Sequence, residues 1–447
     1  MTLATKIFPK QILVDENGKA TNIKLFSFAR PHMRAMHLSW LSFFIAFTGW
    51  FAIPPLMPTI KADLKLTPSQ ISDANLTSVS ATILARLMIG PLCDRYGPRK
   101  AMAGLLLVGS ITIGLAGLAS DANGLIITRF FIGIIGATFV PCQYWASRMF
   151  SSNIVGTANA ICGGFGNMGA GVSYFLIPLI YNAFALGLPP HQAWRVTFVV
   201  PACLCILIAA ADYFLGDDCP GDEWKDQDSS LERHDVEKHG LPRTASDCDS
   251  MEIDDLDDEK PTGRKVISPT SAVMVLGPVR QPSAAVDLLS QLKNPAVLIL
   301  MIHGGMLADY VNTMIGEGIQ GRMLVHFIVF FFQGVFLIGF SFAMGALSSS
   351  IFVLVLFSYC VQAGCGTTFS IVPFANPKSM GAVYGLVGAG GSIGSIVFNY
   401  IFKIYGINYA DGFRVIGYAA LSAAMFTLLL KIQDRMLLGL LFKKLNP

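Results

Sequence analysis

Long apolar blocks alternate with short polar turns along most of the chain. In the first half these blocks cover roughly His37–Ile60, Asp73–Cys93, Ala101–Ser120, Gly124–Phe150, Ile154–Phe184 and Trp194–Leu215. In the second half, four more cover about Met323–Leu347, Ile351–Phe374, Met380–Tyr405 and Gly412–Ile432. An α-helix rises about 1.5 Å per residue, so a block of about 20 residues crosses a hydrocarbon layer of about 30 Å. The pattern predicts an all-α polytopic membrane protein with about ten full transmembrane helices.

The composition agrees with a membrane protein and argues against an enzyme. Hydrophobic residues make up 53% of the 447 residues and charged residues only 14%, and the mean hydropathy is +0.56. The nine cysteines lie mostly inside apolar blocks, and no close-set Cys/His pattern indicates a metal site. The sequence contains no recognisable nucleophile–base set or phosphate-binding loop. We therefore expect a bilayer protein that is not an enzyme, holds no metal or cofactor and binds no nucleic acid.

The basic residues predict the orientation in the membrane, because Lys and Arg are enriched on the cytoplasmic side. They crowd the first 36 residues, follow the second and fourth blocks and return in the tail, whereas the turn Ser120–Gly124 has none. The residues that follow the blocks are Arg95, Arg99, Lys100, Arg148 and Arg435. We expect both termini in the cytoplasm, with residues 1–36 as an N-terminal segment and 436–447 as a tail.

A hydrophilic stretch divides the apolar blocks into two groups. Residues 217–290 hold more than half of all the acidic residues. Such a segment cannot bury enough apolar area to offset its ordering entropy, which predicts a disordered cytoplasmic linker. The linker separates a six-helix N-terminal bundle (37–216) from a truncated C-terminal bundle (291–435). The second bundle opens on the short apolar run Asn294–Tyr310, which would be strained to make one crossing.

The two groups are related by an internal repeat, a common feature of transporters. Three pairs of segments align: Gly156–Gly169 with Gly381–Gly394, Gly136–Phe139 with Gly366–Phe369, and Gly90–Asp94 with Gly305–Asp309. Arg86 lies eight residues before Asp94, and the residue eight before Asp309 is Met301. The second half therefore lacks a counterpart of Arg86, and most of two helices are missing ahead of Asp309.

Arg86 is the first candidate for function because it places a charge inside an apolar block. A cation near the centre of a membrane span costs about 3 kcal/mol even on a lenient insertion scale. The guanidinium group is planar and permanently charged, so it can hold an anion through two parallel hydrogen bonds. The alternative is a structural arginine paired with a carboxylate, although this half has few acids inside its apolar blocks. We expect Arg86 to bind an anion.

The motifs resemble those of a known family of membrane transporters. The sequence GPLCDRYGPRK at Gly90–Lys100 is similar to the loop signature of the major facilitator superfamily, and Arg129–Gly133 adds to the match. The glycine motif Gly163–Gly171, together with Arg86, resembles the nitrate/nitrite porter family and its eukaryotic high-affinity nitrate transporters. The resemblance covers roughly residues 25–216 and 300–435. It implies a two-bundle fold of twelve helices, here without the seventh and most of the eighth.

The resemblance also implies a site. In the family, nitrate binds in a central pore between two arginines, one from each half, and Arg86 matches the first. Asn167 would donate its amide to the anion, or else tie two helices together. Phe47 would stack on the planar anion, or else only pack. Gly166 and Gly169 belong to the same motif, and small residues let membrane helices approach closely.

The second half departs from the family pattern. Its glycine motif contains Gly388, Gly391, Ser392 and Gly394, and Ser392 stands where the motif of the first half has an asparagine. Met301 takes the place of the second arginine. The missing helices remove further residues that line the pore in the family.

Three charged residues follow the second block and indicate a gate. In the superfamily, residues placed like Asp94, Arg95 and Arg99 latch the two bundles and control alternating access. The alternative is a solvated charged turn that marks the topology. Arg129 is either structural or part of a proton path, and we expect His303 to have no special role.

We expect a plasma-membrane transporter of nitrate, or of nitrite, that works by proton symport and alternating access. The alternative is a non-transporting truncated isoform that associates with a full-length sibling or another accessory membrane protein. An incomplete gene model of an ordinary transporter would also give this sequence. The partners expected are therefore the anion, protons and the lipid bilayer.

Overall fold

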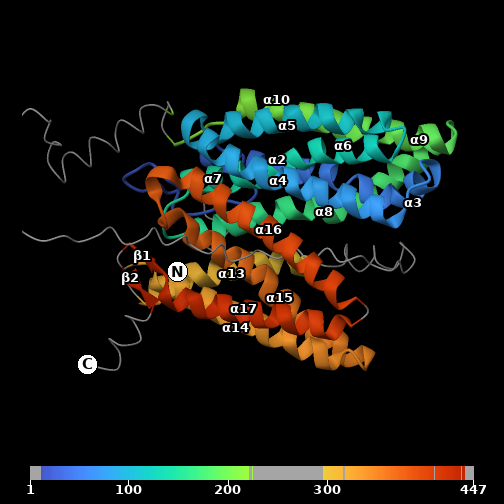
Figure 1. The fold of residues 1–447 in the computed structure, drawn as a ribbon. Helices are drawn as coiled ribbons and strands as arrows, with labels where there is room; N and C mark the ends of the chain where they lie inside the picture. The colour runs from blue at the N-terminus through green and yellow to red at the C-terminus, as the bar shows by residue number, and fades with distance from the viewer. Residues whose placement is uncertain are drawn as a thin grey trace, which may run out of the picture.

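The computed structural model describes residues 12–220, 224, 295–315, 318–406, 408–433 and 435–437, with helices that form two bundles (Figure 1). Nearly all of the expected linker 217–290 and most of the tail 436–447 lie outside the described residues. The first bundle contains α2 (His32–Trp50), α3 (Ile53–Asp63), α4 (Pro68–Tyr96), α5 (Pro98–Gly114), α6 (Ala122–Gly133), α7 (Phe139–Met149), α8 (Val155–Ala185), α9 (Pro190–Thr197) and α10 (Val199–Leu215). The second contains α13 (Pro295–Ile315), α14 (Gln320–Ala343), α15 (Leu347–Ile371), α16 (Met380–Tyr405) and α17 (Tyr409–Leu429).

Short elements complete the described chain. The 3₁₀ helices η1 (Leu115–Leu118) and η2 (Ile134–Thr138) interrupt two of the predicted blocks, and η3 (Val372–Phe374) and η4 (Pro377–Ser379) join α15 to α16. The strands β1 (Lys431–Ile432) and β2 (Arg435–Met436) pair as an antiparallel hairpin after α17.

The predicted all-α membrane architecture is confirmed. Among the described residues, ten helical stretches are long and apolar enough to cross a membrane, from His32–Asp63 to Tyr409–Leu429. Three of them contain two α-helices each: His32–Asp63, Ala122–Met149 and Pro190–Leu215. The first breaks between Trp50 and Ile53 because Pro54 and Pro55 occupy the first turn of α3, where proline has no amide hydrogen to lose from the helix.

An eleventh helix, α13, forms on the short apolar run that precedes the second bundle. We expected this run to be strained as a crossing, and α13 is not among the ten stretches named above. Its helix continues past Asp309 to Ile315 and contains 21 residues, a rise of about 31 Å. It remains shorter than its repeat counterpart α4. Fourteen residues of α13 precede Asp309 (295–308), whereas 26 residues of α4 precede Asp94 (68–93).

The two bundles meet along a few helices. α16 of the second bundle lies against α4, and α13 and α15 lie against α8. We call the end at which α2 begins and α17 finishes the termini end. It lies at the left of Figure 1, and α4, α7, α10 and α13 also end there, while α8 and α16 begin there. This arrangement brings the aligned repeat motifs of the two halves face to face.

Candidate functional site between the two bundles

Arg86 projects from the middle of α4 into the interface between the bundles. Its Nε donates to the carbonyl of Gly136 in η2 (3.2 Å). Its Nη1 donates to the carbonyl of Gly388 (2.6 Å) and to Oγ of Ser392 (3.0 Å), both on α16. The arginine of the first half is therefore held by the glycine motif of the second half.

The groups around Arg86 are neutral. Within the described ranges, no carboxylate lies within ion-pair distance of its guanidinium, so the alternative of a carboxylate-paired arginine does not describe this site. The ring of Phe139 lies 5.7 Å from Arg86 Cζ, a separation typical of a cation–π contact. The positive charge thus stays uncompensated, and an arriving anion would meet it at the bundle interface.

Glycines allow the close approach that this arrangement needs. A Cβ atom added to Gly385 would lie 2.5 Å from the carbonyl oxygen of Arg86, and one added to Gly388 would lie 3.2 Å from its Cδ. Any larger residue at Gly385 would push α16 away from α4. Gly391 and Gly394 continue the same motif along α16, with Gly391 buried and Gly394 half-buried.

The polar and ring contacts of Arg86 do not include Asn167 or Phe47, the other side chains expected to bind substrate. The amide of Asn167 donates to the carbonyl of Gly163 one turn earlier in α8 (2.8 Å). The buried ring of Phe47 packs on Phe43, with ring centroids 4.2 Å apart. Phe139, which the sequence offered only as part of a repeat, is the aromatic residue beside the arginine.

Gly166 and Gly169 serve the packing of α8 on α2. An added Cβ at Gly166 would lie 1.8 Å from Cδ1 of Phe43, and one at Gly169 would lie 2.1 Å from the carbonyl oxygen of Phe44. Both distances are far below van der Waals contact, so α2 and α8 can lie this close only because these residues are glycine.

Asp94 joins the two bundles at the termini end by capping a helix of the other bundle. Its two carboxylate oxygens accept hydrogen bonds from the backbone N–H groups of Gly381 (2.9 Å) and Ala382 (3.0 Å) in the first turn of α16. The first N–H groups of a helix have no partner within the helix and carry its positive dipole end, so a carboxylate is favourable there.

The second half repeats this contact in the opposite direction. Asp309 of α13 accepts hydrogen bonds from the backbone N–H (2.7 Å) and the hydroxyl (2.8 Å) of Thr157 in the first turn of α8. It also accepts one from Nη2 of Arg322 on α14 (2.8 Å), and Arg322 in turn donates to the carbonyl of Ser152. The sequence aligned Asp94 with Asp309, but it gave no sign that each carboxylate reaches into the other bundle, and it missed Arg322.

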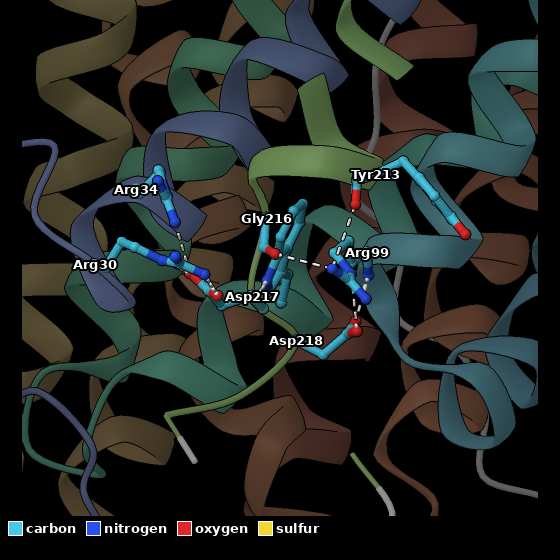
Figure 2. Close-up of polar contacts among 8 residues, drawn as sticks. Arg30, Arg34, Arg99, Tyr213, Gly216, Asp217 and Asp218 are labelled. Atoms are coloured by element: carbon cyan, nitrogen blue, oxygen red, sulfur yellow. Dashed lines mark hydrogen bonds and ion pairs between the residues drawn. The ribbon is translucent and has the colours of Figure 1, made fainter. Parts of the chain in front are cut away.

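Arg95 and Arg99 contact their own bundle. Arg99 donates from its backbone N–H (2.9 Å) and its Nε (3.1 Å) to Asp218, and from Nη1 to the carbonyl of Gly216 (3.0 Å), as Figure 2 shows. The guanidinium of Arg95 lies 5.2 Å from the ring of Tyr96. Of the three residues expected to form a gate, Asp94 makes the contact between bundles.

Two acidic residues after α10 fasten the termini end of the first bundle. Asp217 accepts hydrogen bonds from Arg30 (2.6 Å) and Arg34 (3.3 Å), beside the Asp218–Arg99 pair (Figure 2). Burial alone would raise the pKa of Asp217, but its two arginine partners outweigh that effect and hold the pKa below its usual value. Burial raises the pKa of Asp218 despite the opposing influence of Arg99.

Three further residues singled out in the sequence make none of the contacts of Arg86 described above. Arg129 is buried at the opposite end of the first bundle, where it donates to Oδ1 of Asn75 (2.7 Å) and to the carbonyl of Trp50 (3.3 Å). It therefore joins α2, α4 and α6, which favours a structural role. His303 is exposed on α13, and Met301 lies in the same helix, with its side chain outside the described residues.

Comparisons with known proteins agree on one family. The family model of the Major Facilitator Superfamily matches residues 39–442. The chain is 35% identical to "High-affinity nitrate transporter 2.3" of Oryza sativa subsp. japonica, over 89% of this chain and 77% of the relative. It is 36% identical to "High affinity nitrate transporter 2.5" of Arabidopsis thaliana, over 87% and 77% respectively. It is 27% identical to "Nitrate/nitrite transporter NrtP" of Nostoc punctiforme, over 90% and 92%.

Solved structures show the same fold at low sequence identity. A structure described as the proton:xylose symporter XylE bound to 6-bromo-6-deoxy-D-glucose has a TM-score of 0.58 and is 12% identical, over 88% of this chain and 94% of its own. The human organic anion transporter MFSD10 has a TM-score of 0.55 and is 11% identical, over 89% and 100%.

Proposed function

The chain belongs to the nitrate/nitrite porter family of the major facilitator superfamily, and on this premise we propose that it carries nitrate across the plasma membrane by alternating access. The relatives named as nitrate transporters supply the substrate, and nitrite is the nearest chemical alternative. The family and the two-bundle fold supply the route, which runs between the bundles past Arg86.

The observation that carries the proposal is the uncompensated charge of Arg86. Its hydrogen-bond acceptors are two backbone carbonyls and one hydroxyl, which neutralise no charge. Nitrate is planar and singly charged, so two of its oxygens can accept parallel hydrogen bonds from one guanidinium. An anion that displaces Gly388 and Ser392 from Arg86 would also loosen α16 from α4, which couples binding to movement of the bundles.

Proton symport is part of the proposal for an electrical reason. A negative interior opposes entry of an anion by about 2.3 kcal/mol per charge at 100 mV. Protons that enter with the nitrate remove this barrier and supply a driving force. In the proposed orientation the termini end faces the cytoplasm, so the contacts of Asp94 and Asp309 close the cytoplasmic side.

Nitrate uptake by a transport-null host that expresses the chain tests the proposal. We expect uptake above the background of the host and a loss of uptake in Arg86→Ala. Arg86→Lys is the matched control, because lysine keeps the charge and loses the planar fork, so it should retain weak uptake at high nitrate concentration. Uptake by Arg86→Ala equal to that of the wild type would contradict the role of this residue.

One observation favours a second candidate, a non-transporting subunit of a full-length sibling. Met301 stands where the repeat alignment places a second arginine, and α13 has fewer residues before Asp309 than α4 has before Asp94. A chain of this kind would co-purify with the sibling and show no uptake of its own. Sequencing the transcript across Leu300–Gly305 separates both candidates from a missed exon.

A further inference from the structure

Two pairs of repeat-equivalent residues touch each other between the bundles. The alignment of Gly156 with Gly381 makes Asn159 equivalent to Tyr384, and the amide of Asn159 donates to the Tyr384 hydroxyl (2.9 Å). The alignment of Gly136 with Gly366 likewise makes Phe139 equivalent to Phe369, and their ring centroids are 4.7 Å apart. Equivalent residues of a two-fold repeat can meet only near the axis that relates the halves. These two pairs therefore mark the axis of the molecule.

The Asn159–Tyr384 pair lies between Arg86 and the termini end. Tyr384 precedes Gly388, an acceptor of Arg86, by four residues of α16, which is about 6 Å along the helix. The helix begins four residues before Tyr384, at Met380, and the Asp94 cap lies in that first turn. An anion that leaves Arg86 along the axis toward the termini end therefore meets this pair before it reaches the cap.

A third residue completes the contact. Oγ of Ser147, near the end of α7, lies 2.6 Å from the Tyr384 hydroxyl. The Asn159 amide nitrogen also lies 2.9 Å from Ser147 Oγ and 2.9 Å from the carbonyl oxygen of Phe369 on α15, so its two hydrogens are shared among three acceptors. Asn159 and Tyr384 have no exposed surface, and Ser147 is 2% exposed. Buried polar groups that lose their partners are costly, so these three hold one another firmly.

We propose that Ser147, Asn159 and Tyr384 form an axial latch that must open each time the anion passes between Arg86 and the termini end. The proposal rests on the proposed transport function. Ser147 and Asn159 belong to the first bundle and Tyr384 to the second, so separation of the bundles at this end breaks the latch directly. All three groups are neutral, which distinguishes the latch from the carboxylate caps of Asp94 and Asp309 further toward the same end.

The aromatic rings around the latch would exclude water while it is closed. The ring of Phe369 stacks on that of Tyr384, with centroids 6.0 Å apart and planes at 19°, and also contacts Phe139. Phe139 in turn lies beside Arg86. An apolar layer thus separates the arginine from the polar latch, and both layers close the same path.

The rate of thiol labelling at Cys365 reports how often the latch opens, and it can be measured in the absence of nitrate. Cys365 lies on α15 close to Arg86 and is half-buried, on the far side of the latch from the termini end. A membrane-impermeant methanethiosulfonate applied to the termini face of membrane vesicles reaches it only when the latch is open. The Cys365→Ser variant identifies the part of the signal that comes from this thiol.

Tyr384→Phe keeps the ring and removes the hydroxyl. We expect it to raise the labelling rate of Cys365 about tenfold or more, because the hydroxyl makes neutral hydrogen bonds with both Asn159 and Ser147 and their loss raises the population of the open state. The matched control is Tyr400→Phe, the same substitution on the same helix at an exposed position, which should label at the wild-type rate. Equal labelling of Tyr384→Phe and wild type would overturn the proposal.

A second variant covers the case in which Tyr384→Phe does not fold. Ser147→Ala removes the other hydroxyl of the short contact and should raise labelling in the same way; wild-type labelling would overturn the proposal. Where both variants fold, the double variant should label no faster than Tyr384→Phe, because that change alone already removes both hydrogen bonds by which the Tyr384 hydroxyl joins the bundles. Labelling needs no nitrate, so the test of the latch does not depend on transport. Faster labelling of the variants of a chain that takes up no nitrate would support the latch and contradict the transport function. Unchanged labelling of the variants of a chain that does take up nitrate would contradict the latch and leave the transport function standing.

Discussion

At Arg86, three neutral oxygens and the face of one aromatic ring replace the water that a guanidinium would have outside the membrane. The acceptors come from η2 and α16, so the residue binds both bundles at once. The sequence could identify Arg86, because a lone charge in an apolar block is a strong signal. It could not identify Phe139 as the neighbouring ring, because Phe47 is equally aromatic and only the structure shows that Phe47 packs on Phe43, Trp50 and Phe51.

Asp309 and Arg322 form a buried ion pair in which each partner depends on the other. Their side chains are 7% and 2% exposed and 2.8 Å apart. Removing one partner leaves a buried charge unpaired, so Asp309→Asn and Arg322→Gln should each lower the free energy of unfolding by about 3–5 kcal/mol. Thermal unfolding of the purified protein in detergent measures the loss.

Asp411→Asn is the control for this pair, because the Asp411–Arg414 bridge is about one third exposed on both sides. Exposed pairs contribute about 0–1 kcal/mol, so this variant should unfold almost like the wild type. If Asp309→Asn is no less stable than Asp411→Asn, the buried pair has no structural importance.

At the scale of elements, helices were predictable and their interruptions were not. Every apolar block became a helical stretch, since length and hydropathy decide whether a segment crosses a membrane. The 3₁₀ segment η2 arises where Gly136 lies against Thr82 of α4, a contact that only tertiary structure reveals. Likewise, the repeat alignment was visible in the sequence, but the meeting of Asn159 with Tyr384 depends on where the axis passes.

The contact of α4 with α16 predicts the effect of one added methyl group. Gly385→Ala should destabilise the protein by about 1–3 kcal/mol and impair nitrate uptake, because its Cβ would lie 2.5 Å from the Arg86 carbonyl. Gly104→Ala on α5 has nothing within 4 Å of the new Cβ and should be neutral or stabilising by up to about 1 kcal/mol. Thermal unfolding and uptake of the two variants give the comparison; equal behaviour would contradict close packing at Gly385.

We expect Lys19 to make the packing of the N-terminal segment (residues 12–31) against the first bundle depend on pH, and we call this packing docking. Its ammonium donates to the carbonyl of Ser147 at the end of α7 (3.3 Å). Burial and the nearby Arg148 lower its pKa from 10.5 to about 8, with Asp15 opposing. In the undocked segment Lys19 regains its ordinary pKa, so it binds its proton more tightly there than in the docked segment. Docking should therefore strengthen as the pH rises from about 8 toward 10.5 and should not change with this group below that range.

Limited proteolysis of the N-terminal segment at about pH 7.5, below the window set by the two pKa values, and at about pH 9.5, inside it, measures this effect. The ratio of cleavage rates for wild type and Lys19→Met removes the pH dependence of the protease itself. Cleavage of the wild type should slow relative to the variant at the higher pH. A ratio that does not change with pH would show that Lys19 does not control docking.

At the scale of the whole molecule, the hydrogen bonds between the bundles follow the axis in order. Arg86 comes first, then Ser147, Asn159 and Tyr384, and then the carboxylate caps at the termini end. A molecule joined in this way can open the termini end only by breaking the caps and the latch together. The arrangement fits one state of an alternating-access cycle, in which the path from Arg86 to the termini end is closed.

Proton coupling can be tested on the whole molecule by measuring proton uptake and nitrate accumulation together. We expect nitrate added to energised cells or vesicles to cause proton uptake from the same side, and a protonophore to reduce the accumulation of nitrate. Chloride at the same concentration is the control for nonspecific anion effects. Nitrate accumulation that is unaffected by collapse of the proton gradient would contradict symport.

The central claim is that this chain, by itself, moves nitrate past Arg86. The most direct test is nitrate uptake into liposomes that contain only the purified chain, with Arg86→Ala and Arg86→Lys in parallel. We expect uptake by the wild type, none by Arg86→Ala and an affinity about tenfold or more lower in Arg86→Lys, because a charge-assisted, bidentate contact is lost. No uptake by a folded wild-type chain, or undiminished uptake by Arg86→Ala, would contradict it.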